Sequence, residues 1–113
     1  MKRYTLTLDL KDDPVLISEY ISWHKNVWPE IKRSIKDSGI HDMFIYHFQT
    51  RLFMLIYTDD DFSFEKKAVL DRANARVQEW EKLMSSFQQG IEGAGPDEKW
   101  VLMEEIFNLN EPQ

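Results

Sequence analysis

The sequence of 113 residues contains no cysteine. This absence excludes a disulfide framework, a zinc site built on thiolates and a cysteine nucleophile. It fits a reducing compartment, so we expect a cytoplasmic protein. The N-terminal segment lacks the apolar stretch of a signal peptide, and no apolar run approaches the roughly 18 residues of a membrane span.

Positive charge is also scarce, because 14 lysines and arginines stand against 20 acidic residues and give a formal net charge of −6. An acidic chain is a poor partner for nucleic acid or for an anionic membrane, so we expect neither. Aromatic residues, in contrast, make up 13% of the chain. They are typical of small-molecule pockets, although they also fill ordinary cores.

The first third of the chain has the sequence pattern of a strand followed by two helical segments. Residues 3–10 alternate apolar and polar side chains, as in a half-buried strand. Asp13 and Pro14 predict the start of a helix. Pro29 predicts a break before a second helical piece, which the glycine at position 39 should end.

The rest of the chain supplies a hairpin, a helix and a last strand. The expected segments are strands at 41–48 and 51–57, a helical region at 64–88, a turn-rich loop at 90–97, a strand at 99–107 and a loose polar tail from 108. The order strand, helix, strand, strand, helix, strand predicts one α+β domain, residues 1–113, with the ferredoxin-like βαββαβ fold.

Both strands of the predicted hairpin are apolar on both faces. Met43 and Ile45, for example, oppose Tyr46 and Phe48. Helices cover only one face of such a sheet, and soluble monomers rarely expose an apolar patch larger than a few hundred Å². We therefore expect a homodimer whose two sheets pack face to face about a two-fold axis. A monomer with residues 89–98 folded over the second face is the alternative.

Tyr20 and His24 form the pair of side chains best suited to proton transfer. They are four residues apart on the first predicted helix, which places them on the same side, about 6 Å apart along its axis. An imidazole with a pKa near 6.5 is the natural acid or base at neutral pH. Spacing alone leaves open a second interpretation, in which both side chains simply point into the core or to solvent.

The sequence around this pair resembles a known family. Residues 19–30, EYISWHKNVWPE, are similar to the EYxxxHxxxWPE signature of the L-rhamnose mutarotases. Residues 39–42 with 45–46 resemble the GxHN…IY stretch of that family, and residues 77–84 resemble its helix motif ending in WWxxM. The chain closes on a Glu-Ile-Phe strand at 105–107, as those proteins do. The resemblance covers essentially the whole chain.

The resemblance implies a dimeric ferredoxin-like α+β barrel that interconverts the anomers of L-rhamnose or of a related deoxy sugar such as L-fucose. It implies that His24 is the acid/base, that Tyr20 is its hydrogen-bonding and orienting partner, and that Trp80 forms a wall of the pocket. Tyr46 is a further candidate for the pocket. The expected partners are therefore a monosaccharide and a second copy of the chain.

Two positions depart from the family pattern and bear on substrate choice. Met43 stands where the rhamnose enzymes carry a pocket tyrosine, and Glu81 stands where they carry a second tryptophan. Both residues are therefore expected to line the substrate pocket and to change its polar groups. Which deoxy sugar is the substrate stays open.

Mutarotation needs only proton transfer to open and close a hemiacetal, so we expect neither a metal nor a cofactor. His41 and His47, six residues apart on one strand, would be about 20 Å apart, too far for one metal ion. Two other functions remain as alternatives. A non-catalytic sugar-binding or regulatory dimer would not need His24, and a cofactor-free oxygenase would need a larger, more apolar pocket.

Overall fold

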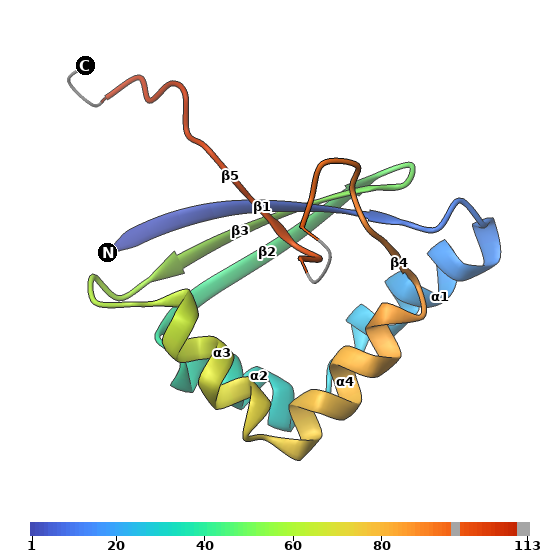
Figure 1. Cartoon of the computed structure of the whole chain (residues 1–113), viewed down its shortest axis with the longest axis horizontal. Helices are drawn as coiled ribbons and strands as arrows, with labels where there is room; N and C mark the ends of the chain where they lie inside the picture. The colour runs from blue at the N-terminus through green and yellow to red at the C-terminus, as the bar shows by residue number, and fades with distance from the viewer. Residues whose placement is uncertain (96–97, 111–113) are drawn as a thin grey trace.

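The computed structural model describes residues 1–95 and 98–110 (Figure 1). Residues 96–97 of the predicted loop and 111–113 of the predicted tail lie outside them. The elements along the chain are β1 Lys2–Leu10, α1 Pro14–Lys25, α2 Pro29–Asp37, β2 Ile40–Phe48, β3 Arg51–Thr58, α3 Phe64–Arg72, α4 Ala75–Ser85, β4 Gln88–Gln89 and β5 Val101–Met103.

The strands form one antiparallel sheet in the order β2-β3-β1-β4, and β5 also pairs with β1. The helices lie together on one face of this sheet (Figure 1). β4 pairs with the end of β1 at Asp9 and Leu10, whereas β5 pairs with its middle at residues 5–7. Two short strands, β4 and β5, therefore occupy the edge position where one last strand was predicted. The prediction of a ferredoxin-like α+β fold is confirmed.

The core lies between the sheet and the helices. Alternate residues of the central strands point toward the helices, and Leu8, Leu52 and Ile56 among them are at most 1% exposed. On the other face of the sheet, Tyr46 and Phe48 are 59% and 75% exposed. A strand turns successive side chains to opposite faces, so the hairpin keeps one apolar face under the helices and one uncovered.

Local sequence signals set the ends of the first two helices. The Asp13 carboxylate accepts hydrogen bonds from the amides of Val15 and Leu16, and Pro14 occupies the first helical position. α2 begins at Pro29, which confirms the predicted break before a second helix, and it starts one residue before the expected Glu30. No helix in the described part of the chain has the length and apolar character needed to cross a lipid bilayer.

The hairpin turn is as short as the sequence predicts. Phe48 pairs with Arg51, so only Gln49 and Thr50 lie in the loop. Gln49 has a φ of 53°, in the left-handed region that tight hairpin turns require. A glutamine is an uncommon residue there, because its Cβ makes that region less favourable than it is for glycine.

Two predicted elements differ in the structure. The expected helix over 64–88 is two helices, because the Asn74 side chain accepts hydrogen bonds from the amides of Arg76 and Val77 and so starts α4 anew. The strand expected over 99–107 pairs only at Val101–Met103. Beyond it Ile106 is 87% exposed, since the described part of the chain offers that segment no neighbouring strand.

Candidate functional site

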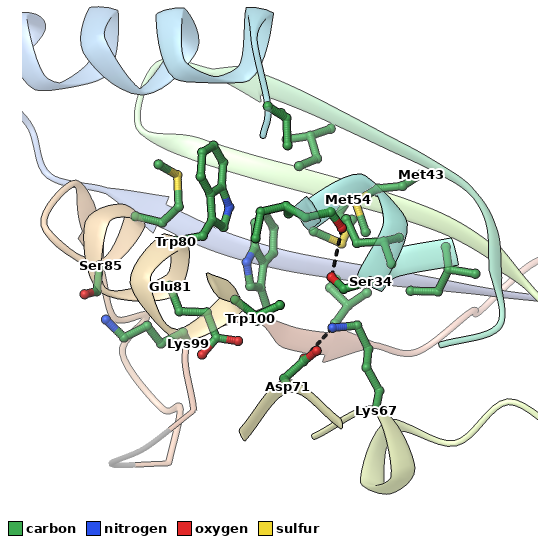
Figure 2. Close-up of a pocket in the computed structure, with 18 of the residues that line it drawn as sticks. Ser34, Met43, Met54, Lys67, Asp71, Trp80, Glu81, Ser85, Lys99 and Trp100 are labelled. Atoms are coloured by element: carbon green, nitrogen blue, oxygen red, sulfur yellow. Dashed lines mark hydrogen bonds and ion pairs between the residues drawn. The ribbon is translucent and has the colours of Figure 1, made fainter. Parts of the chain in front are cut away.

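A cavity of about 810 Å³ lies between the inner face of the sheet and the four helices (Figure 2). This volume is in the range of small-molecule sites. Apolar side chains from three strands form the floor, namely Leu6, Ile40, Met43, Ile45, Met54 and Ile56. The helices and the segment before β5 supply the walls and the polar groups.

Tyr20 and His24 come together on the α1 wall of this cavity. Tyr20 is buried and His24 is half-buried, with ring centroids 4.4 Å apart. The Nδ1 of His24 lies 2.8 Å from the backbone oxygen of Tyr20. A carbonyl oxygen only accepts, so Nδ1 carries the hydrogen, and Nε2 on the far side of the ring is left as a free proton acceptor.

Burial sets the protonation states of this pair. It lowers the pKa of His24, against the opposing effect of the hydrogen bond to the Tyr20 carbonyl. It raises the pKa of Tyr20, against the opposing effect of the Gln88 side chain. At neutral pH the imidazole is therefore uncharged and ready to accept a proton, and the phenol keeps its hydrogen as a donor.

Trp80 forms a rigid aromatic wall beside this pair. Its ring centroid lies 5.9 Å from that of His24, in an edge-to-face arrangement. Trp28 and Trp23 support it from behind, at 5.0 Å and 6.3 Å. Trp80 is only 8% exposed, so its ring is held in place at the cavity. An aromatic face of this kind suits the C–H face of a sugar ring.

The two positions that depart from the family pattern also line the cavity. Met43 lies on the sheet floor and Glu81 lies on α4, next to Trp80 (Figure 2). Glu81 is at the rim, and its carboxyl pKa is raised, first by partial burial and then by the nearby carboxylate of Asp71. Gln78 donates a hydrogen bond of 3.3 Å to the Glu81 carboxylate.

Tyr46 is the one predicted site residue that the structure does not bring to the cavity. Its neighbour Ile45 faces the cavity, so Tyr46 points to the opposite, uncovered face of the sheet. The other five, Tyr20, His24, Met43, Trp80 and Glu81, share one cavity.

Several residues that sequence reasoning did not select also line the cavity. They include the polar side chains Lys67, Asp71, Gln78 and Gln88, together with Trp100. Lys67, Asp71 and Gln78 are on helices, where polar residues at these spacings look like an ordinary solvated surface, so no sequence signal marks them. Within residues 1–95 and 98–110, no group of three or more histidine and carboxylate side chains is placed to hold a metal ion.

Comparison with known proteins connects this geometry to a family. The sequence model of L-rhamnose mutarotase matches residues 3–109. An L-fucose mutarotase from Xanthomonas campestris pv. campestris is 40% identical over 113 residues, which cover 98% of this chain and 90% of that protein. The matched range thus reaches every element of the fold and spans the positions of all the residues that line the cavity.

Two solved structures share the fold. An L-rhamnose mutarotase from Formosa agariphila superposes with a TM-score of 0.71 at 22% identity, covering 96% of this chain and 99% of the other. A dimeric ferredoxin-like protein from an uncultured marine organism gives a TM-score of 0.56 at 13% identity, with coverages of 94% and 90%. At these identities the structures support the fold, whereas the sequence match decides the family. The chain belongs to the L-rhamnose mutarotase family.

Proposed function

We propose that the protein is a cofactor-free mutarotase that interconverts the α and β anomers of L-fucose, L-rhamnose or a closely related deoxy sugar. The observation that carries the proposal is the imidazole of His24. Its Nδ1 is held by the Tyr20 carbonyl, its Nε2 is free, and it lies on a cavity wall beside Trp80. Family membership and the L-fucose mutarotase relative support the substrate class.

The reaction that this site suits is the opening and closing of a hemiacetal ring. Nε2 of His24 takes the proton of the anomeric hydroxyl, the bond between the anomeric carbon and the ring oxygen breaks, and the protonated Nε2 then returns that proton to the ring oxygen. The resulting aldehyde rotates about its bond to the next carbon, and closure by the reverse steps gives the other anomer. Positioned acid–base catalysis of this kind contributes about 10²–10⁴-fold. The buried Tyr20 hydroxyl orients the sugar oxygens.

Polarimetry tests the proposal. A freshly dissolved single anomer of L-fucose or L-rhamnose relaxes to its equilibrium rotation, and the protein should accelerate that relaxation in proportion to its concentration. The equilibrium rotation itself should stay the same, because a catalyst changes only the rate. Sugar binding without any acceleration would instead identify a non-catalytic sugar-binding or regulatory dimer.

Substrate preference is expected to depend on Met43 and Glu81. Met43→Tyr adds a phenol to the cavity floor, and Glu81→Trp replaces a carboxylate by a ring on its rim. Sites that hydrogen-bond a hydroxyl discriminate strongly against a mismatched partner, so the order of exchange rates among deoxy sugars should change. The measurement compares L-fucose, L-rhamnose and other deoxy sugars for both single variants and the double variant. An unchanged order would contradict a role in specificity.

We also propose that the functional protein is a homodimer joined through the uncovered sheet face. Phe44, Tyr46 and Phe48 lie exposed on that face, and Leu102 and Phe107 from the C-terminal segment are exposed as well. So large an apolar surface favours a second copy as its cover. A ferredoxin-like neighbour described as dimeric supports this arrangement.

The absence of cysteine is compatible with action in the cytoplasm.

Sedimentation equilibrium at micromolar concentration measures the assembly. We expect twice the single-chain mass of 13.5 kDa. Phe48→Asp should shift the protein toward monomer, because it places a charge in the proposed interface. Val69→Asp, at an exposed apolar position on α3 on the helical side, is the matched control and should leave the dimer intact. A wild-type mass near 13.5 kDa would contradict the dimer.

A further inference from the structure

The cavity has a polar wall that the chemistry of ring opening does not use. Four side chains form it, where α3 and α4 meet: Lys67, Asp71, Gln78 and Glu81. In Figure 2, Lys67 and Asp71 approach from α3 and Glu81 from α4, and all three labelled side chains lie on the side of the cavity away from Met43. We call this group the α3–α4 polar wall.

Internal contacts hold the α3–α4 polar wall in place. Lys67 Nζ lies 2.6 Å from Asp71 Oδ2. Gln78 Nε2 donates to the backbone oxygen of Asp71 at 2.8 Å and to Glu81 Oε2 at 3.3 Å. The amide of Gln78 therefore ties the end of α3 to the Glu81 carboxylate on α4.

The Lys67–Asp71 pair is unusually sheltered for a pair within one helix. Its side chains are only 24% and 13% exposed, because they border the cavity instead of the outer surface. For comparison, the Arg76–Glu79 pair on α4 is 43% and 61% exposed and lies outside the cavity. A sheltered carboxylate keeps strong hydrogen-bond acceptors available to a ligand that enters.

The two kinds of cavity wall differ in chemistry. The α1 wall presents an imidazole and a phenol and, with Trp80, carries no formal charge at neutral pH. The α3–α4 polar wall presents two carboxylates, an ammonium and an amide. A sugar has one anomeric hydroxyl and several ring hydroxyls. The anomeric carbon belongs at His24, so the remaining hydroxyls are left to meet the charged acceptors.

We propose that the α3–α4 polar wall is a specificity subsite that binds the ring hydroxyls remote from the anomeric carbon, with Asp71 as its central acceptor. The inference rests on the proposed mutarotase function and adds the orientation of the sugar to it. The sugar's apolar C–H groups lie against Trp80 and against the floor that Met43 and Ile45 provide.

The subsite predicts a loss of binding when Asp71 becomes asparagine. Asp71→Asn keeps the shape of the side chain but removes its charge, so Kd and KM for the sugar should rise about tenfold to a hundredfold. Turnover at saturating sugar should change little, because contacts remote from the reacting atoms act on binding in the ground and transition states alike. Glu79→Gln, which removes an exposed carboxylate on α4 outside the cavity, is the matched control and should leave both constants unchanged.

Deoxy analogues that lack one remote ring hydroxyl distinguish recognition from a merely structural role. If Asp71 accepts a hydrogen bond from one hydroxyl, the analogue lacking that hydroxyl should bind wild type and Asp71→Asn with nearly equal affinity. A structural role predicts the same loss for every analogue. Glu81→Gln, which leaves the Lys67–Asp71 pair intact, is the second variant should Asp71→Asn fail to fold. Its loss of affinity for the sugar should likewise disappear with one of the deoxy analogues.

Calorimetric binding and anomer exchange are measured on the same samples, so the two proposals fail separately. If the wild-type protein catalyses anomer exchange and the Kd for the sugar is unchanged in Asp71→Asn and Glu81→Gln, the subsite proposal is wrong and the mutarotase proposal stands. If the wild-type protein binds the sugar without catalysing exchange, the mutarotase proposal is wrong. The subsite proposal is still supported in that case if Asp71→Asn loses affinity for L-fucose but not for one deoxy analogue. A wild-type protein that binds neither L-fucose nor L-rhamnose overturns both.

Discussion

Replacing His24 by alanine is expected to slow catalysed anomer exchange about 10²–10⁴-fold at saturating sugar. The substitution removes the only imidazole among the residues that line the described cavity. The hydrogen bond of His24 in the described part of the chain runs to a backbone carbonyl of its own helix, and its ring lies beside Tyr20 and Trp80 at the wall of an existing cavity, so the fold should remain intact. Polarimetric rates measured beside circular dichroism spectra separate a loss of chemistry from a loss of structure.

His47→Ala is the matched control for this experiment. His47 is an exposed histidine on β2 that does not line the cavity, so its loss should leave the exchange rate unchanged. A folded His24→Ala protein that exchanges anomers at nearly the wild-type rate would show that His24 is not the acid/base. The proton would then have to pass through another group, such as the Tyr20 hydroxyl.

Leu52→Ala is expected to lower the free energy of unfolding by about 2–5 kcal/mol. Leu52 is 1% exposed, pairs with Leu8 across the two central strands and packs within the larger of the two core clusters. Removing its buried methyl groups loses their transfer free energy and leaves a void that the rigid sheet only partly fills. Urea denaturation followed by tryptophan fluorescence measures the change.

Leu70→Ala on α3 makes the same substitution at a residue that is 53% exposed. It should change stability by less than about 0.5 kcal/mol, because little apolar surface returns to water. Equal effects at Leu52 and Leu70 would contradict the placement of the core between the sheet and the helices.

The strands and the first helix could be predicted from the sequence because local signals and tertiary burial agree there. The alternation of Leu6, Leu8 and Leu10 with polar residues matches the inner face of β1. Asp13 and Pro14 cap α1 as expected. In these segments the period of the apolar pattern and the capping chemistry depend on near neighbours only.

The second half of the chain was less predictable. The apolar pattern continues through residues 64–88, so it hides the break at Asn74, whose side chain bonds to the amides that follow it. The C-terminal residues 104–107 have strand-like composition but find no partner strand among residues 1–95 and 98–110. Strand pairing is decided by distant segments, and a single sequence does not reveal them.

The candidate site shows the same division. Spacing and side-chain chemistry, together with the family resemblance, pointed to Tyr20 and His24, and the resemblance alone pointed to Trp80. The structure brings all three to one cavity. Met43 and Tyr46 are three residues apart on one strand, so their side chains point to opposite faces of the sheet and do not line the same cavity. Asp71 went unnoticed, since its spacing from Lys67 is equally typical of a solvated helix surface.

Saturation-transfer NMR on a mixture of anomers at equilibrium tests the central claim most directly. Irradiating the anomeric proton of one form transfers saturation to the other only if the two interconvert during the pulse. With the wild-type protein and L-fucose or L-rhamnose, we predict a signal loss that grows with protein concentration and returns to the uncatalysed level in His24→Ala. A wild-type protein that causes no transfer above the uncatalysed level with either sugar would contradict the account.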